Sequence, residues 1–136
     1  MSTDMGKTFT KTFHKPTVEL VVIDNGKTKA TVVASLSDNP DVAYESTDGG
    51  LTWHDFSQGI NFGGYIPFYT HLTAHVPQRG TGHSPSVFLA AYAVNPKNNS
   101  IDRSLLWHRY LGDNYSRWMP VKNTPKTMVN YAWQIM

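Results

Sequence analysis

The sequence predicts an all-β fold made of antiparallel four-stranded units. Runs of β-branched and aromatic residues recur along the 136 residues, and Gly-, Pro- and Asn-containing turns separate them. No segment shows the 3.6-residue periodicity of an amphipathic helix. One eight-residue turn motif occurs twice. Four-stranded units repeated at intervals of tens of residues are typical of a β-propeller. We therefore expect the blades of a partial propeller, within a single domain of residues 1–136.

The first unit spans residues 17–56. A β-branched run at 17–23 is followed by Asp24-Asn25-Gly26-Lys27, which contains the strongest short hairpin signal. A polar loop at 37–41 and the turn motif separate the later strands. The four predicted strands are 17–23, 29–36, 42–45 and 51–56.

The second unit spans residues 69–121 and repeats the same order. Its predicted strands are 69–76, 86–94, 104–110 and 116–121. Residues 7–13 are predicted as the outer strand of an incomplete earlier unit, and 128–135 as the inner strand of a later one. Two and a half units cannot close a ring. The chain is then a piece of a longer propeller, an assembly of copies joined through open sheet edges, or a small sandwich or barrel.

Composition narrows the chemistry. There is no cysteine, which excludes disulfides, thiolate zinc sites and a cysteine nucleophile. A net charge of +2 is too small to indicate a nucleic-acid partner. No apolar run reaches membrane-spanning length, and no signal peptide opens the sequence, so no membrane partner is expected. No cofactor is predicted.

The repeated motif has the frame Ser-x-Asp-x-Gly-x-Thr-aromatic, at residues 2–9 and 46–53. A degenerate copy at 111–118 keeps only the Asp and the aromatic. We expect each Asp carboxylate to accept hydrogen bonds from its own turn, and each Gly to supply a positive φ. The residues with this structural role are Asp4, Gly6, Asp48, Gly50, Trp53, Asp113 and Trp118.

This frame resembles the Asp-box, the bacterial neuraminidase repeat of sialidases, xyloglucanases, sortilin-type receptors and some photosystem assembly factors. The resemblance implies a β-propeller with the motif between the third and fourth strands of each blade. It also implies an extracellular or periplasmic location and a carbohydrate partner. In sialidase-like propellers the ligand binds at the end opposite the motif.

Successive turns of a meander lie at alternate ends of the sheet. The end opposite the turn motif would therefore gather the loops 37–41, 57–67 and 95–103. Carboxylates that bind hydroxyl groups beside aromatic faces suit a sugar. The ligand-binding candidates are Asp38, Asp41, Phe62, Tyr65, Asp102 and Arg103.

A complete sialidase-like site is not expected. Asp41 and Asp102 could supply the carboxylate pair of a glycosidase. However, the only arginines are at 79, 103, 109 and 117, and glutamate occurs only at 19 and 45, inside strands. The catalytic residues therefore stay unknown, and any enzyme activity would be that of a glycoside hydrolase. We expect a glycan-recognising module; the alternative is a non-catalytic protein-interaction module.

Two other patterns are weaker. His71 and His75 have the spacing of a helical zinc pair, but their segment is predicted as a strand, so no metal site is expected. Residues 2–13 are similar to the terminal hairpin of barnase-type ribonucleases, but Met5 stands where that family has its catalytic histidine.

Overall fold

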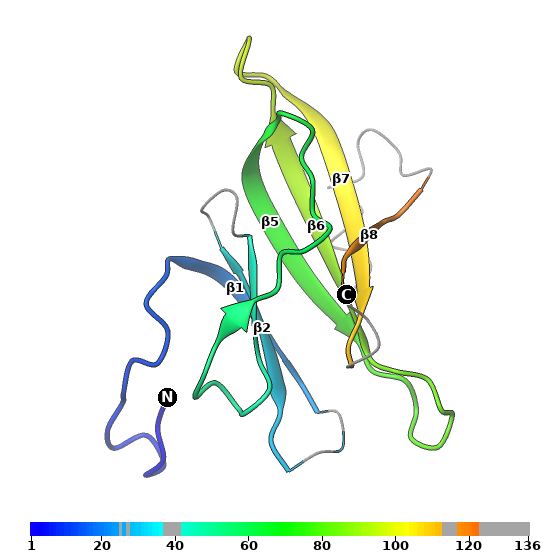
Figure 1. Ribbon diagram of the computed structural model, residues 1–136. Coiled ribbons are helices and arrows are strands. Elements are labelled where there is room, and N and C mark those ends of the chain that lie inside the picture. Colours follow the sequence, from blue (N-terminus) through cyan, green and yellow to red (C-terminus); the bar gives the residue numbers. More distant parts are fainter. Residues whose placement is uncertain (25, 27, 37–41, 113–116, 123–136) are drawn as a thin grey trace.

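The protein is described here by a computed structural model that covers residues 1–24, 26, 28–36, 42–112 and 117–122, without the side chains of 68, 69 and 101–104. All regular structure in this part of the chain is β, arranged as two antiparallel four-stranded sheets (Figure 1). The strands are β1 (Thr17–Ile23), β2 (Thr31–Leu36), β3 (Ala43–Ser46), β4 (His54–Asp55), β5 (Ile66–His75), β6 (Ser86–Val94), β7 (Ile101–Tyr110) and β8 (Met119–Pro120).

Both sheets are simple meanders. The strand order is β1-β2-β3-β4 in the first sheet and β5-β6-β7-β8 in the second. The predicted all-β class and both four-stranded units are confirmed, and the bounds of β1 and β6 agree with the prediction. The last strand of each sheet, β4 or β8, is only two residues long, and one further backbone bond follows it, from Phe56 N–H to Ala43 O or from Val121 N–H to Leu106 O.

The predicted strand at residues 7–13 is wrong. This segment pairs with no strand of the described chain; Thr10 N–H instead donates to Met1 O at 2.7 Å. It leads to Phe13, whose ring packs on Tyr44 and Trp53 with centroid distances of 5.3 and 4.7 Å. Aromatic packing therefore holds this end of the chain against the first sheet. The predicted strand at 128–135 lies outside the described residues.

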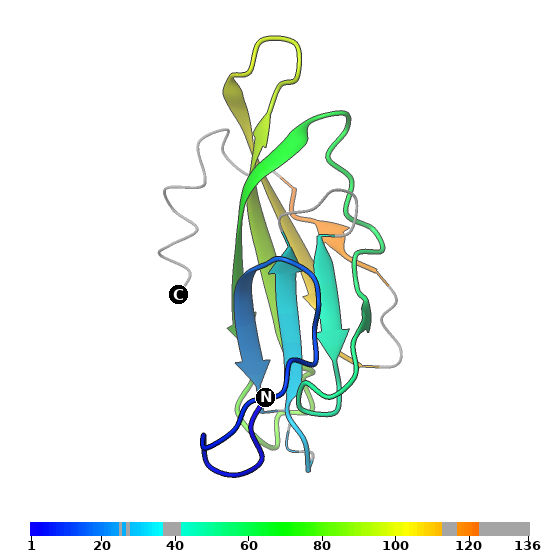
Figure 2. The ribbon, with the colours of Figure 1, turned by 90° about the vertical axis from the view of Figure 1, so that its left-hand side faces the viewer.

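The hydrophobic core lies between the two sheets. Along β6, Val87, Leu89, Ala91 and Ala93 are buried in it, as expected for a strand that alternates its faces. Ile23 and Val33 bring the first sheet to the same core. Figure 2 shows the first sheet lying in front of the second. Burial of these side chains is what joins the two meanders into one unit.

The two copies of the turn motif share the hydrogen bonds that join Ser, Asp and Thr, and Asp48 also accepts one from Leu51 N–H. The Asp48 carboxylate accepts bonds from Thr52 N–H at 2.9 Å and Thr52 Oγ1 at 2.5 Å, and Asp4 accepts the corresponding bonds from Thr8 at 2.9 and 2.6 Å. The φ angles of Gly6 and Gly50 are 86° and 95°. The predicted self-capped turn is confirmed at both places, whereas Asp113 lies outside the described residues.

A packing relationship also repeats. Phe13 contacts Trp53 and Tyr44, and Phe56 contacts Trp118 at a centroid distance of 5.7 Å and lies under the Arg109 guanidinium. Tyr44 is 65 positions before Arg109, and Trp53 is 65 positions before Trp118. The partners of Phe13 and of Phe56 therefore have equivalent positions in the two sheets.

Tyr44 points away from the second sheet, while Arg109 points toward the first, where it binds Phe56 O. Equivalent faces therefore point the same way, and the sheets are stacked head to tail.

Candidate functional site

Of the six predicted ligand residues, only Phe62 and Tyr65 have side chains within the described part of the chain. Asp38 and Asp41 lie outside the described residues, and the side chains of Asp102 and Arg103, on β7, do as well. Phe62 is only 8% exposed and packs edge-on against Trp107, with centroids 5.1 Å apart. Tyr65 is half-buried and packs on the same core.

Phe62 thus acts as a core residue that leaves little of its ring for a ligand. The loop after β4 turns back on itself, through bonds from Ile60 N–H to Ser57 O and from Tyr65 N–H to Phe62 O. These two turns place the Phe62 ring in the core between the sheets.

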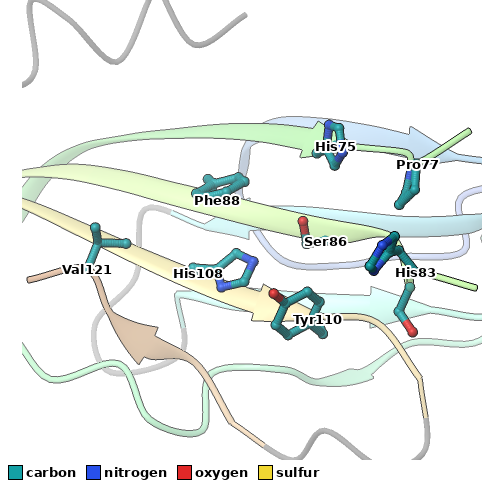
Figure 3. Close-up of a pocket in the computed structure, with 9 residues that line it drawn as sticks. His75, Pro77, His83, Ser86, Phe88, His108, Tyr110 and Val121 are labelled. Carbon is teal, nitrogen blue, oxygen red and sulfur yellow. The ribbon is translucent and has the colours of Figure 1, made fainter. Parts of the chain in front are cut away.

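A cavity of about 440 Å³ lies on the outer face of the second sheet (Figure 3). It is near the 76–85 loop, at the end of the sheet opposite the loop of residues 95–100 (Figure 1). It therefore lies at the other end from the predicted ligand loops. Its lining consists of His75, Pro77, His83, Ser84, Ser86, Phe88, His108, Tyr110 and Val121.

The strand register explains why these side chains meet. Ser86 pairs with both His75 and Tyr110, and Phe88 pairs with His108. Directly paired residues of an antiparallel sheet project from the same face. Because alternate residues of β6 point into the core, Ser86 and Phe88 point to the opposite face.

His108 is the centre of an aromatic row. Its ring lies 4.7 Å from that of Phe88 and 4.5 Å, edge to face, from that of Tyr110. Burial lowers the pKa of His108 below its ordinary value of 6.5, because a charged imidazolium would lose solvation there. The ring is therefore neutral at neutral pH.

The cavity lining contains no charged side chain of the Asp, Glu, Lys or Arg type. The Asp24 and Arg79 side chains, 3.8 Å apart, line a second cavity of about 1010 Å³ that shares Pro77 and His83 with the first. Among the described residues, no three His, Asp or Glu side chains are placed to hold a metal ion. The three histidines of the lining are thus suited to hydrogen bonding.

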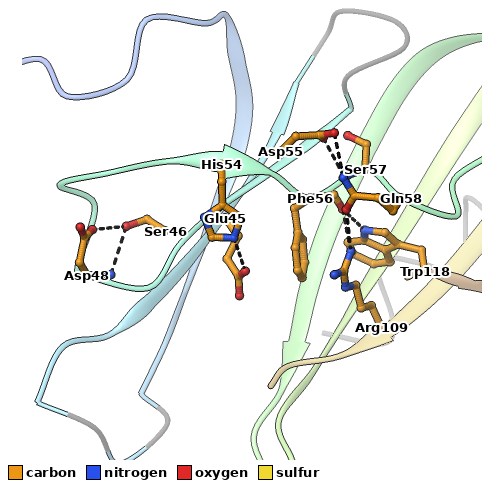
Figure 4. Close-up of polar contacts among 10 residues, drawn as sticks. All are labelled: Glu45, Ser46, Asp48, His54, Asp55, Phe56, Ser57, Gln58, Arg109 and Trp118. Atoms are coloured by element: carbon orange, nitrogen blue, oxygen red, sulfur yellow. Dashed lines mark hydrogen bonds and ion pairs between the residues drawn. The ribbon is translucent and has the colours of Figure 1, made fainter. Parts of the chain in front are cut away.

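Arg109, which lies between His108 and Tyr110 in sequence, has its side chain on the other face of the strand (Figure 4). It is 7% exposed, its guanidinium lies 3.7 Å from the Phe56 ring centroid, and Nη1 donates to Phe56 O at 3.2 Å. Trp118 Nε1 donates to the same oxygen at 2.5 Å. Burial lowers the pKa of Arg109, which Glu45 and Asp55 partly offset. This arginine joins the sheets.

The sequence reasoning missed the cavity residues His75, His83, Phe88, His108 and Tyr110. The alternation of Val87, Phe88 and Leu89 was a usable signal, since it puts Phe88 on the face away from an apolar core. The register that sets Phe88 beside His108 was needed as well, and strand lengths alone do not give it.

Comparison of the chain with protein-family models, with curated proteins and with solved structures found no match. No helix in the described part of the chain is long and apolar enough to span a membrane.

Proposed function

We propose that this chain is a glycan-recognising module of sialidase or glycoside-hydrolase propeller type, without a complete active site of its own. The observation that carries the proposal is the cavity between Phe88, His108 and Tyr110. Aromatic rings offer faces for the C–H groups of a sugar, and the Ser84 and Ser86 hydroxyls and the imidazoles offer hydrogen bonds. Concave sites of this size with a few polar groups are the usual form of small-ligand sites.

The propeller type is part of the proposal. Two features support it: the turns at Asp4 and Asp48, which share their Ser, Asp and Thr bonds and resemble the Asp-box, and the head-to-tail stacking of equivalent sheet faces. In a propeller each blade presents one face to the preceding blade and the other to the next. A two-sheet sandwich instead turns the inner faces of both sheets toward each other, so that equivalent faces of two repeats would point in opposite directions.

The absence of carboxylates from the lining supports recognition rather than hydrolysis. Hydrolysis of a glycosidic bond usually needs two carboxylates that flank it. The lining has none, although it has groups that can donate and accept hydrogen bonds.

A glycan array with the purified chain tests this function. We expect the wild type to bind, and Phe88→Ala and Tyr110→Ala to lose most of the signal at unchanged Tm. Phe9→Ala is the matched control, because Phe9 is 76% exposed and lies outside the cavity. Absence of binding to every glycan, or binding unaffected by both cavity variants, would contradict the proposal.

A second candidate function, a protein-interaction module, is favoured by a different surface. Val18, Leu20 and Val22 on β1 are 44, 54 and 69% exposed. Ala74 of β5 has the position in the second sheet that Leu20 has in the first, and it packs on the core beneath the first sheet. The exposed face of β1 is therefore equivalent to a face that another sheet covers in the second unit.

A photo-activatable cross-linker at position 22 tests this candidate, with position 51 as the control because Leu51 is also exposed, at 45%. Protein adducts specific to position 22 would support an interaction module. Equal labelling at both positions would refute it.

A further inference from the structure

We propose that the cavity on the second sheet takes an uncharged sugar, at most a mono- or disaccharide unit, and excludes sialylated and sulfated ones. This rests on the proposed glycan recognition and names its ligand class. The nine lining residues combine aromatic faces, hydroxyls and imidazoles without a single Lys, Arg, Asp or Glu. That composition sets the charge of the ligand.

A carboxylate or sulfate that binds in this open cavity, where Ser86 is the one buried lining residue, gives up part of its hydration and gains no Lys or Arg partner from the lining in return. Burying an unpaired charge is far more costly than burying hydroxyls that find hydrogen-bond partners. Partial burial lowers the pKa of His108 below its ordinary value, so the imidazole next to Phe88 does not supply a positive charge at neutral pH.

The neighbouring arginines do not make the binding of an anion in this cavity more favourable. Arg109 donates to Phe56 O on the opposite face of the sheet. Arg79 belongs to the adjacent cavity, is 88% exposed in its side chain, and lies 3.8 Å from the Asp24 carboxylate, which offsets its charge. A bound anion in the first cavity would therefore meet no dedicated cation from the lining.

The polar groups of the lining suit hydroxyls. Ser86 is 4% exposed and lies between His75 and Tyr110 across the strands, at the end of the sheet where β6 begins (Figure 3). A hydroxyl and an uncharged imidazole can each donate and accept, as a sugar hydroxyl does. Phe88 and His108 add apolar ring surface beside them.

The size of the cavity limits the ligand. About 440 Å³ is at the lower end of the range for small-ligand sites. Pro77 and Val121 lie at opposite ends of the lining (Figure 3). The site is thus fitted to a terminal sugar residue or a disaccharide, and a longer chain would extend into solvent.

Binding of matched neutral and sialylated glycans tests the inference, using the whole chain. We expect the wild type to bind neutral glycans at least tenfold more strongly than their sialylated forms. Ser84→Arg, which adds a cation to a partly buried lining position, should narrow or reverse that preference. Thr81→Arg is the control, because it adds the same charge to an exposed position outside the lining, and it should keep the wild-type preference.

The outcomes separate the two proposals. Wild-type binding restricted to sialylated or sulfated glycans overturns the ligand class and leaves glycan recognition standing. An identical effect of Ser84→Arg and Thr81→Arg also overturns it, because charge in the cavity would then not set the preference. Binding of no glycan at all overturns glycan recognition itself.

Discussion

Glu19 on β1 reaches across to His71 on β5, and its Oε2 lies 3.0 Å from the imidazole Nδ1. The same carboxylate oxygen accepts a 2.7 Å bond from Leu72 N–H. One side chain of the first sheet thereby binds both the backbone and a side chain of the second, and it does so beside the buried core. The His71 side chain is 5% exposed, so this contact is largely shielded from solvent.

Glu19→Gln should lower the free energy of unfolding by about 1–2 kcal/mol, because an amide replaces a charged acceptor of a backbone N–H. Urea denaturation of the variant measures the change. Asp24→Asn is the control, since Asp24 is 77% exposed in its side chain and its ion pair with Arg79 is loose. Equal effects of the two substitutions would show that Glu19 does not join the sheets.

Asp48→Ala should lower Tm by roughly 2–8 °C, the range expected when a turn loses its capping side chain. The carboxylate accepts bonds from Leu51 N–H and Thr52 N–H, which alanine leaves without this partner. Glycan binding at 20 °C should persist, because Asp48 does not line the cavity. Loss of binding at full stability would assign Asp48 a ligand role instead.

Acid should remove the contribution of the turns. Bonds from the Thr8 side chain and backbone, then from Ser2, lower the pKa of Asp4 to about 2, and the corresponding groups lower that of Asp48 further. A folded-state pKa below the ordinary 3.8 means that the stabilisation is complete above about pH 4 and is lost as pH falls through about 2. The difference in Tm between wild type and Asp4→Asn/Asp48→Asn should therefore become smaller as pH falls from 5 to 2. A constant difference would contradict this.

Gly59→Ala should destabilise the fold by about 3 kcal/mol or more. Gly59 has φ +97°, and a Cβ there would come within 2.3 Å of Trp118 O, a backbone atom that cannot swing away. Gly63→Ala is matched, with φ +60° and open space around the new Cβ, so it should cost only about 1 kcal/mol. Similar chemical denaturation midpoints for the two variants would show that residues 58–59 do not pack tightly on Trp118.

The sequence predicted the meanders well because their signals are local. The β-branched run at residues 17–23 fixes β1 without knowledge of the rest of the chain, and the turn signal after it predicts that a second strand follows; β2 begins at Thr31, two residues later than the predicted residue 29. The bonds of Asp48 are also local, reaching no further than Thr52.

The errors concern contacts that are distant in sequence. Residues 7–13 have strand composition, but no described strand pairs with them, and Phe13 stacks on aromatic rings instead. Phe62 is in a loop, yet the packing of the two sheets places it against Trp107. The cavity depends on the register between β6 and β7, which composition does not specify.

The turn at residues 2–8 indicates the order in which parts of this protein fold. Residues 2–8 have no strand on either side, yet they form the same Asp–Thr bonds as residues 46–52, which join β3 to β4. Every side-chain bond of these turns spans at most four residues. Loops this short close in well under a microsecond, long before sheets assemble. The turn can therefore form before the sheet that contains it. A repeated copy of this turn reverses the direction of the chain independently of the strands that flank it.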